Sequence, residues 1–211
     1  MTALILDLTF HSPFRVATGL ARPGLQDTID PQDLLPATTL KGLLRASAEQ
    51  LTEDALHGEP LVGAVFGTKR SASPWAFGSV EWLAPWQTVV RTRVALDPVQ
   101  GAARRDALYT AEEVAFSDTA PVPHARLRID QYHPLPPDLP EREDHLVVLS
   151  CAAAGVHHLG ADRRRGLGWV TITPHHADGA HAVTAATITR LHDLSARPAS
   201  SAHVVPEDTD A

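Results

Sequence analysis

Residues Ala3-Leu4-Ile5-Leu6-Asp7-Leu8-Thr9-Phe10 open the chain with an apolar side chain at every second position. Leu4, Leu6, Leu8 and Phe10 therefore share one side of an extended backbone, because successive side chains of a strand point to opposite faces. The pattern predicts a strand over residues 3–10 with one face against a hydrophobic core. The elements that follow this strand decide how that core is covered.

A helix is the next element that the spacing predicts. Between Thr39 and Leu51 the apolar side chains recur three or four positions apart, which places them on one stripe of a helix. Thr38 or Thr39 can cap its first turn, since threonine hydroxyls accept hydrogen bonds from the free amides of a helix start. We therefore expect a helix over residues 39–51.

Further elements follow toward the C-terminal end. Residues 125–130 alternate and predict a strand. A proline-rich segment separates it from a second helix, which begins in an acidic turn at Glu141 and continues on an apolar face to Val156. Residues 169–173 are rich in β-branched side chains and predict a closing strand. Residues 184–193 predict a last short helix.

With a short strand over residues 78–83, the order reads strand, helix, strand, strand, helix, strand. This order predicts an α+β fold, a ferredoxin-like (RRM-like) βαββαβ core with both helices on one face of an antiparallel sheet. Long loop insertions are expected at about 11–37 and 84–124. We expect one domain over residues 1–194 and a disordered tail over 195–211, which has few apolar groups. Unrelated enzymes and regulators share this fold, so it does not establish a function.

The second insertion has two parts. Residues 89–96 predict a strand or hairpin arm, with Arg91 and Arg93 on one face and Val90, Thr92 and Val94 on the other. Residues 97–124 are rich in turns and charges and show no clean period. We interpret them as an irregular insertion.

Composition limits the function. The 211 residues are 44% hydrophobic and 20% charged, enough apolar side chains for a substantial core. The net charge of −7 argues against indiscriminate coating of nucleic acid, so any nucleic-acid site must be local. One cysteine excludes an intrachain disulfide, and we expect a reducing cytoplasm. The sequence predicts neither a secretory signal nor a membrane span.

Leu35-Pro36-Ala37-Thr38-Thr39-Leu40-Lys41-Gly42-Leu43-Leu44-Arg45 is the first segment with the chemistry for a site. Two hydroxyls stand where helix amides are unpaired, and Lys41 and Arg45 lie four positions apart on one face. Such a helix start can grip phosphate. The alternative is an ordinary capped helix with two solvated cations.

Leu159-Gly160-Ala161-Asp162-Arg163-Arg164-Arg165-Gly166-Leu167-Gly168 is the second such segment. Its glycines permit positive φ and close backbone approach, and its three arginines supply forked donors that match phosphate oxygens. The alternative is a solvated turn between a helix and a strand.

Together the two segments resemble the RAMP superfamily of CRISPR-associated proteins, whose members pair a P-G-S-S-L-K-G-x-x-R-like helix start with a G-x-x-R-x-R-G-L-G-like loop. Val65-Phe66-Gly67-Thr68 resembles the F-G element that follows the first helix in this family. Residues 91–114 resemble the R-x-R-V-x-(I/L)-D…G-x-A…L-(F/Y)-x-x-E-x-V stretch of type III backbone subunits. Ala37 departs from the pattern, which commonly has glycine there.

The resemblance implies subunits that stack along a guide RNA, with the insertion as a thumb that kinks the guide–target duplex. Sequence selection would come from base pairing. The implied partners are guide RNA, target RNA and other CRISPR effector subunits, including copies of this chain or RAMP paralogues. The implied RNA-binding residues are Thr38, Thr39, Lys41, Arg45, Arg91, Arg93, Arg163, Arg164, Arg165, Gly166 and Gly168.

Type III backbone subunits also cleave target RNA, with an acidic residue before the first helix and a divalent metal. The resemblance implies that Asp27, which follows Gly24-Leu25-Gln26, is catalytic and binds a metal such as Mg²⁺. Asp30 is the second candidate and Asp33 a third. An Asx turn, or simple loop solubility, is the alternative for these carboxylates.

Two other functions stay open. Some RAMP relatives are stand-alone endoribonucleases that process guide RNA with a histidine general base. The candidates here are His11, His124 and His133. An ordinary surface or core histidine is the simpler interpretation of each. The other possibility is a structural or capping RAMP subunit that binds RNA without cutting it.

Overall fold

The computed structural model describes residues 2–52, 58–97, 99–135 and 142–196. Its chain order is β1 (Thr2–Phe10), α1 (Ala37–Leu51), α2 (Gly58–Phe66), β2 (Trp75–Phe77), β3 (Glu81–Trp82), β4 (Trp86–Leu96), β5 (Ala103–Phe116), β6 (Ala125–Gln131), α3 (Arg142–Ala154), the short 3₁₀ helix η1 (Arg163–Arg165), β7 (Val170–His176) and α4 (Ala185–Ala196).

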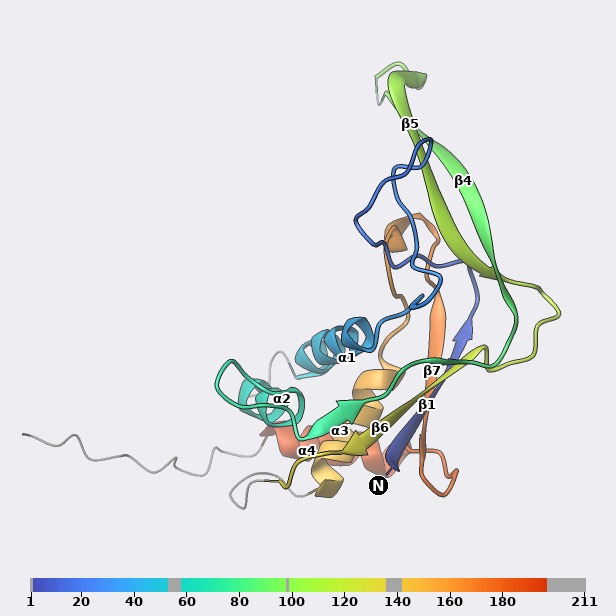
Figure 1. Cartoon of the computed structure of the whole chain (residues 1–211). Helices are drawn as coiled ribbons and strands as arrows, with labels where there is room; N and C mark the ends of the chain where they lie inside the picture. The colour runs from blue at the N-terminus through green and yellow to red at the C-terminus, as the bar shows by residue number, and fades with distance from the viewer. Residues whose placement is uncertain (1, 53–57, 98, 136–141, 197–211) are drawn as a thin grey trace, which may run out of the picture.

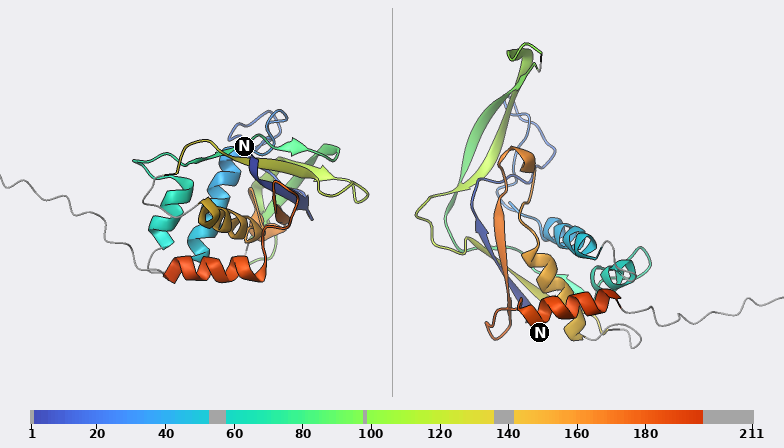
Figure 2. Two further views of the ribbon diagram at one scale, coloured as in Figure 1. Left: turned by 90° about the horizontal axis from the view of Figure 1, so that it is seen from below. Right: turned by 180° about the vertical axis from the view of Figure 1, so that it is seen from behind.

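The main sheet is antiparallel, with the strand order β2-β6-β1-β7, and β3 also pairs with β6. β1 lies between its two long neighbours, so that Leu6 pairs with Leu127 of β6 and Leu8 pairs with Ile172 of β7. Helices α1, α2, α3 and α4 lie on one side of this sheet (Figures 1 and 2). An α+β architecture is therefore confirmed.

The core fills the space between the sheet and these helices. From β1 it takes Leu4, Leu6 and Leu8, none of which is exposed to solvent. Leu40 of α1 and Leu149 of α3 are equally buried on the helix side. The alternation in residues 3–10 predicted this burial, because the face that meets the helices must be apolar.

Most predicted elements are present. The strands at 3–10 and 125–130 and the helices at 39–51 and 184–193 correspond to β1, β6, α1 and α4. The strand predicted at 78–83 is only Glu81–Trp82, and a separate strand, β2, precedes it. α2 was not predicted. α4 continues through Ala196, and the rest of the predicted disordered tail lies outside the described residues.

The prediction of an irregular insertion over 97–124 was wrong. Residues 103–116 form β5, which pairs along its length with β4 in a two-stranded hairpin. The hairpin projects from the body of the molecule (Figure 1). Neither face of the hairpin packs against the main core along its whole length. The sequence of the hairpin therefore lacks the regular alternation of apolar side chains that a core strand shows. The predicted grouping of Arg91 with Arg93 is confirmed, and Val90 and Val94 on the other face are exposed.

The first insertion contains neither helix nor extended strand, as predicted, but it is packed and not a loose excursion. Phe14, Ile29, Leu34 and Leu35 are buried. The backbone of Phe14 exchanges two hydrogen bonds with Val114 of β5, of 3.0 and 2.8 Å. This loop therefore joins the hairpin to the start of α1.

None of the described helices is both long enough and apolar enough to span a bilayer.

Candidate nucleic-acid interface

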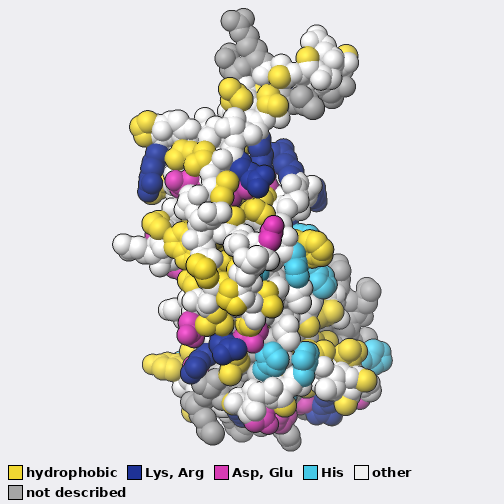
Figure 3. All heavy atoms as spheres, turned by 90° about the vertical axis from the view of Figure 1, so that its right-hand side faces the viewer, with side chains coloured by type: hydrophobic (Ala, Val, Ile, Leu, Met, Phe, Trp, Pro, Cys, Tyr) yellow, Lys and Arg dark blue, Asp and Glu magenta, His cyan; other side chains and the backbone are white. Residues whose placement is uncertain are grey.

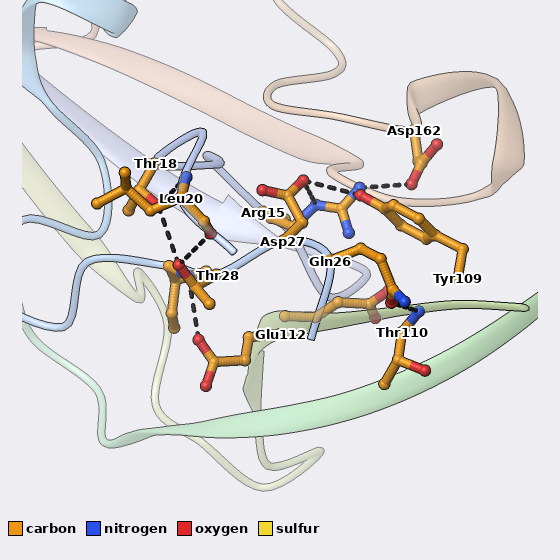
Figure 4. Close-up of polar contacts among 12 residues, drawn as sticks. Arg15, Thr18, Leu20, Gln26, Asp27, Thr28, Tyr109, Thr110, Glu112 and Asp162 are labelled. Carbon is orange, nitrogen blue, oxygen red and sulfur yellow. Dashed lines mark hydrogen bonds and ion pairs between the residues drawn. The ribbon is translucent and has the colours of Figure 1, made fainter. Parts of the chain in front are cut away.

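A buried cluster of charged side chains joins three segments that lie far apart in the sequence. Its centre is Arg15, in the first insertion, whose side chain is 3% exposed. Arg15 Nη2 donates to Asp162 Oδ2 over 2.7 Å, and Arg15 Nε lies 3.4 Å from Asp27 Oδ2 (Figure 4). The guanidinium also lies 5.4 Å from the centre of the Tyr109 ring of β5. One cation thus contacts both insertions and the loop before β7.

The hairpin contributes the rest of this cluster. Arg93 donates to Asp162 over 2.7 Å and to Glu113 over 2.6 Å, and Arg91 Nε lies 3.1 Å from Glu113. Glu113 is fully buried. Three guanidinium groups therefore face three carboxylates, which nearly neutralises the interior of the cluster. Buried charges need such compensation, because leaving one unpaired costs several kcal/mol.

The segment 159–168 is held to the first insertion by backbone hydrogen bonds as well. The amide of Ala161 donates to Arg15 O, and the amide of Gly168 donates to Pro13 O, both over 2.8 Å. Gly168 has a φ of +71°, and a Cβ there would collide with the carbonyl oxygen of Leu159. The shape of the loop therefore requires glycine at 168. The sequence alone could not distinguish this structural role from a contact with RNA.

The three arginines of this segment form η1 and are exposed. Asp162, directly before them, has a left-handed backbone with a φ of +55°. Its carboxylate contacts Arg15 and Arg93 inside the cluster and lies 3.7 Å from Arg165 on the outside. The buried side of this loop is neutralised and fixed, so the cations of η1 face solvent.

The start of α1 differs from the prediction. Pro36 is the N-cap, and no side chain caps the helix. The amides of Thr39 and Leu40 donate to Pro36 O instead, over 2.9 and 3.2 Å. Thr38 and Thr39 therefore lie within the first turn and the predicted threonine cap was wrong, because the helix begins two residues earlier than expected.

The two cations of α1 are engaged with neighbouring groups. Arg45 donates to Glu49 over 2.8 Å and to the carbonyl of Gly67 over 3.1 Å. The ammonium of Lys41 lies 5.7 Å from the centre of the Phe77 ring. Burial, and to a smaller extent the charge of Arg45, lowers the pKa of Lys41. Both can still meet phosphate, but Arg45 also holds α1 to the end of α2.

The structure brings the predicted RNA-binding residues together only in part. Arg91 and Arg93 lie in the charged cluster beside η1, whereas Lys41 and Arg45 lie on α1. The first insertion connects the two groups, since its Arg15 holds the η1 loop and its Pro36 is the N-cap residue of α1. No hydrogen bond or ion pair between described residues joins η1 directly to Lys41 or Arg45. On the face in Figure 3, Lys and Arg side chains gather below the hairpin tip.

Asp27 contacts two neighbouring side chains through its carboxylate. Its Oδ2 accepts a hydrogen bond from the Tyr109 hydroxyl over 2.8 Å and faces Arg15. Burial first, and then this hydrogen bond to Asp27, raises the pKa of Tyr109. Across the residues that the structure describes, no three acidic, histidine or cysteine side chains gather to share a metal ion. The guanidinium of Arg15 and the hydroxyl of Tyr109 thus both engage the same carboxylate oxygen of Asp27, Oδ2.

Asp30 is exposed and forms an Asx turn, in which its Oδ1 accepts a hydrogen bond from the amide of Gln32 over 2.9 Å. The backbone carbonyl of Asp30 also accepts from the amide of Asp33 over 3.2 Å. These contacts are the local turn that the sequence allowed as the alternative to catalysis.

Two of the three histidine candidates are neighbours in space. His11 and His124 both line a cavity of about 530 Å³ at the base of the hairpin. His124 Nδ1 accepts a hydrogen bond from the amide of Phe10 over 2.9 Å, and burial, followed by the charge of His11, lowers the pKa of His124. His124 thus has a structural contact with the end of β1. His133 is exposed and packs edge-on against Tyr132.

Sequence reasoning missed Arg15, Tyr109, Glu113 and Asp162 as members of the site. Asp162 was in a segment that the sequence singled out, but its role inside the cluster depends on Arg15 and Arg93. Arg15 carried no signal, because a lone arginine in a loop is ordinarily exposed.

One family model matches most of the chain. The chain matches the family described as RAMP superfamily over residues 7–171. It is similar to a structure described as "Cryo-EM structure of the Type III-B Cmr-beta bound to cognate target RNA", with a TM-score of 0.59 and 16% identity over 86% of this chain and 61% of that one. It is also similar to a chain in the structure of the apo state of the Type III-B Cmr-beta, with a TM-score of 0.58 and 8% identity. That match covers 82% of this chain and 96% of the other.

At these identities the two structures show a shared fold only, and the chain spans 61% of the length of the first one. No curated protein matches the sequence.

Proposed function

This chain belongs to the RAMP superfamily, and from that membership we propose that it is a guide-RNA-binding backbone subunit of a type III-like CRISPR effector complex. The exposed arginines Arg163, Arg164 and Arg165 carry the proposal, because they are the cations that the fold presents to solvent on a fixed loop. Guanidinium groups bind the phosphates of RNA through forked hydrogen bonds. A fixed loop loses little conformational entropy on binding.

The local nature of this charge supports a specific RNA site over general nucleic-acid coating. The chain carries a net charge of −7, so a polyanion is repelled from most of its surface. Charge in the interior of the cluster is almost balanced, so the attraction comes from η1, the outer part of Arg91, and Lys41 on α1. We assign the guide backbone to the surface around η1 and Arg91, with Lys41 as a separate contact on α1.

The fold supports the same assignment. Taken without α2, α4 and the β4–β5 hairpin, the order β1, α1, β2 with β3, β6, α3, β7 corresponds to a ferredoxin-like βαββαβ core, as in RRM domains. The hairpin leaves this core at the position of the second insertion. We assign it the role of the thumb that kinks the guide–target duplex.

The expected partners come from the proteins with this fold. One similar structure is of a Cmr-beta complex bound to cognate target RNA. We propose that this chain likewise meets target RNA, through base pairing with the guide, and contacts other effector subunits, including copies of itself or RAMP paralogues.

We propose a non-catalytic role for Asp27. Its contacts to Arg15 and Tyr109 make it a structural tie between the first insertion and the hairpin. The subunit would then hold RNA without cutting it, in contrast to metal-dependent cleavage of the target.

Co-purification tests the central proposal. The full chain, expressed with the subunits encoded beside it, should carry a short RNA of defined length. Replacing Arg163, Arg164 and Arg165 by glutamine should remove most of this RNA. It should also make the slope of log K against log salt concentration shallower by about 2, because each phosphate contact to a single strand contributes about 0.7 to that slope. Arg142→Gln at the start of α3 is the matched control. An RNA-free chain that co-purifies with no other subunit would contradict the proposal.

A further inference from the structure

Trp169 is a large aromatic side chain that the fold holds at the surface. It follows Gly168 at the end of the η1 loop, and the residue is 53% exposed. Its amide donates to the hydroxyl of Ser12, and its carbonyl accepts from the amide of His11, each over 2.9 Å. Both backbone groups are therefore fixed. A half-exposed indole on a fixed backbone adds little to the core and is available to a ligand.

His11 extends this aromatic surface. Its ring centre lies 4.8 Å from that of Trp169, and its Nε2 lies 2.8 Å from the Thr171 hydroxyl, which fixes the ring. Trp169 directly precedes β7, and both it and Thr171, two positions later, are exposed, whereas Val170 between them is buried. The two ring planes are inclined by 46°, so they form one aromatic platform with two faces at an angle to each other.

The cavity of about 530 Å³ lies next to this platform. His11 and Ser12, which both contact Trp169, line it together with Arg91, Phe116 and His124. Phe116 and His124 are stacked, with ring centres 4.3 Å apart and planes 12° from parallel. Arg91, 55% exposed, provides a cation in the same lining. Aromatic walls and one guanidinium are together what a nucleotide requires.

We propose that Trp169, His11 and the cavity beside them form a subsite for one unpaired base of single-stranded RNA, with Arg91 facing the phosphate of that nucleotide. A base stacks on an aromatic side chain whatever its sequence, because every base has a π-face. The subsite begins one residue after the glycine that ends the η1 loop. An RNA strand held by Arg163–Arg165 can therefore place a neighbouring base on Trp169.

Chemistry favours RNA over a protein as the occupant. The lining holds Arg91, and the three arginines of η1 precede Trp169 by four to six positions, so the surroundings attract a polyanion. Asp118 also lines the cavity and repels phosphate on its own side. This arrangement directs the phosphate toward Arg91 and the base toward the rings. The inference rests on the proposed RNA-binding function and adds base stacking to it.

Two RNA probes separate base stacking from phosphate contact. One is a single-stranded oligoadenylate, and the other is an abasic ribose-phosphate oligomer with the same number of phosphates. For the RNA-free full chain, Trp169→Ala should weaken oligoadenylate binding by about tenfold, or about 1.4 kcal/mol, because one stacked base is lost. The affinity for the abasic oligomer should stay within about twofold. Trp169→Phe, which keeps a ring, should bind oligoadenylate within about threefold of the wild type.

The outcomes distinguish this inference from the proposed function. Glutamine at Arg163, Arg164 and Arg165 should weaken both probes, because it removes phosphate contacts. If Trp169→Ala leaves both affinities unchanged while the arginine variant weakens them, the stacking subsite is overturned and RNA binding stands. Equal weakening of both probes by Trp169→Ala also overturns stacking. If neither probe binds the wild-type chain, both proposals fail. Thermal unfolding of each variant verifies that it is folded.

Discussion

The guanidinium of Arg15 and the carboxylate of Asp162 are 147 positions apart in the sequence and 2.7 Å apart in the structure. The pair is largely shielded from solvent, with 3% of the Arg15 side chain and 19% of the Asp162 side chain exposed. It connects the loop before α1 to the loop before β7. The placement of η1, and with it the proposed RNA interface, depends on this contact.

Replacing Arg15 by methionine should therefore destabilise the protein. The variant fills much of the same volume but leaves Asp27 without its cation and Asp162 with Arg93 alone inside the cluster, which costs on the order of 3 kcal/mol. Urea unfolding of the variant and the wild type measures this difference. Arg45→Met is the matched control, because the Arg45–Glu49 pair is 44% and 53% exposed and contributes less than about 1 kcal/mol. Equal losses in the two variants would contradict a central role for Arg15.

Two glycines of the η1 loop should respond differently to alanine. Gly166 has a φ of +82° but open space around it, so Gly166→Ala should cost only about 1 kcal/mol of backbone strain. Gly168 combines its positive φ with the carbonyl of Leu159 in the path of a Cβ. Gly168→Ala should cost about 3 kcal/mol. Thermal unfolding ranks the two, and the reverse order would show that the loop is shaped differently.

The sequence predicted those parts of the fold whose side chains repeat with the period of their secondary structure. β1 was visible because one of its faces meets the core, which forces Leu4, Leu6 and Leu8 into alternation. β5 was not visible, because it belongs to a projecting hairpin. Its apolar Leu108 is exposed and its charged Glu113 is buried, which is the reverse of the pattern in a core strand. A periodic apolar pattern therefore predicts strands that pack against the core. It does not predict strands that pair outside the core.

The site was predicted to a similar extent. The exposed arginines of η1 stood out because three adjacent cations between glycines are unusual in a structural turn. The contacts of Arg15 with Asp27 and Asp162 could not be predicted, because any loop arginine can in principle pair with any loop carboxylate. The predicted threonine cap failed because Ala37 and Thr38 extend α1 toward Pro36, whose fixed φ allows a helix to begin directly after it.

His145 should make the stability of the fold sensitive to acid. It is fully buried in α3, and its Nδ1 accepts a hydrogen bond from Trp75 Nε1 over 3.0 Å. Burial lowers the pKa of His145 from 6.5 to about 4. Between these values the unfolded chain binds a proton that the folded chain does not, so the free energy of unfolding falls as the pH is lowered from about 6.5 to about 4. The loss is on the order of 3 kcal/mol.

Urea unfolding at a series of pH values measures this contribution. His145→Asn keeps an acceptor for Trp75 and cannot be protonated, so its stability should fall less steeply in that range even though it is lower at pH 7. Carboxylates titrate in the same range in both proteins and cancel in the comparison. Parallel curves for the wild type and the variant would show that His145 is protonated in the folded state.

Asp27 and Asp30 give the sharpest test of whether this chain cuts RNA, because they lie three positions apart in one loop and differ in their contacts. Asp27→Asn removes the charge that faces Arg15 and should cost about 2 kcal/mol in urea unfolding, while Asp30→Asn should cost less than about 0.5 kcal/mol. In the assembled complex with Mg²⁺, we expect neither variant to change the rate of target RNA cleavage by more than the loss of folded protein explains. Gel analysis of labelled target RNA measures that rate.

A different result would assign catalysis to Asp27. If Asp27→Asn abolished cleavage while guide affinity and the unfolding midpoint stayed at wild-type values, the carboxylate would have to act on RNA directly. It would then bind a metal ion through Oδ1, since in this structure Arg15 and Tyr109 both contact its Oδ2. Tyr109→Phe separates the two cases, because it should speed cleavage if the tyrosine restrains a catalytic Asp27 and should only destabilise the hairpin if Asp27 is structural.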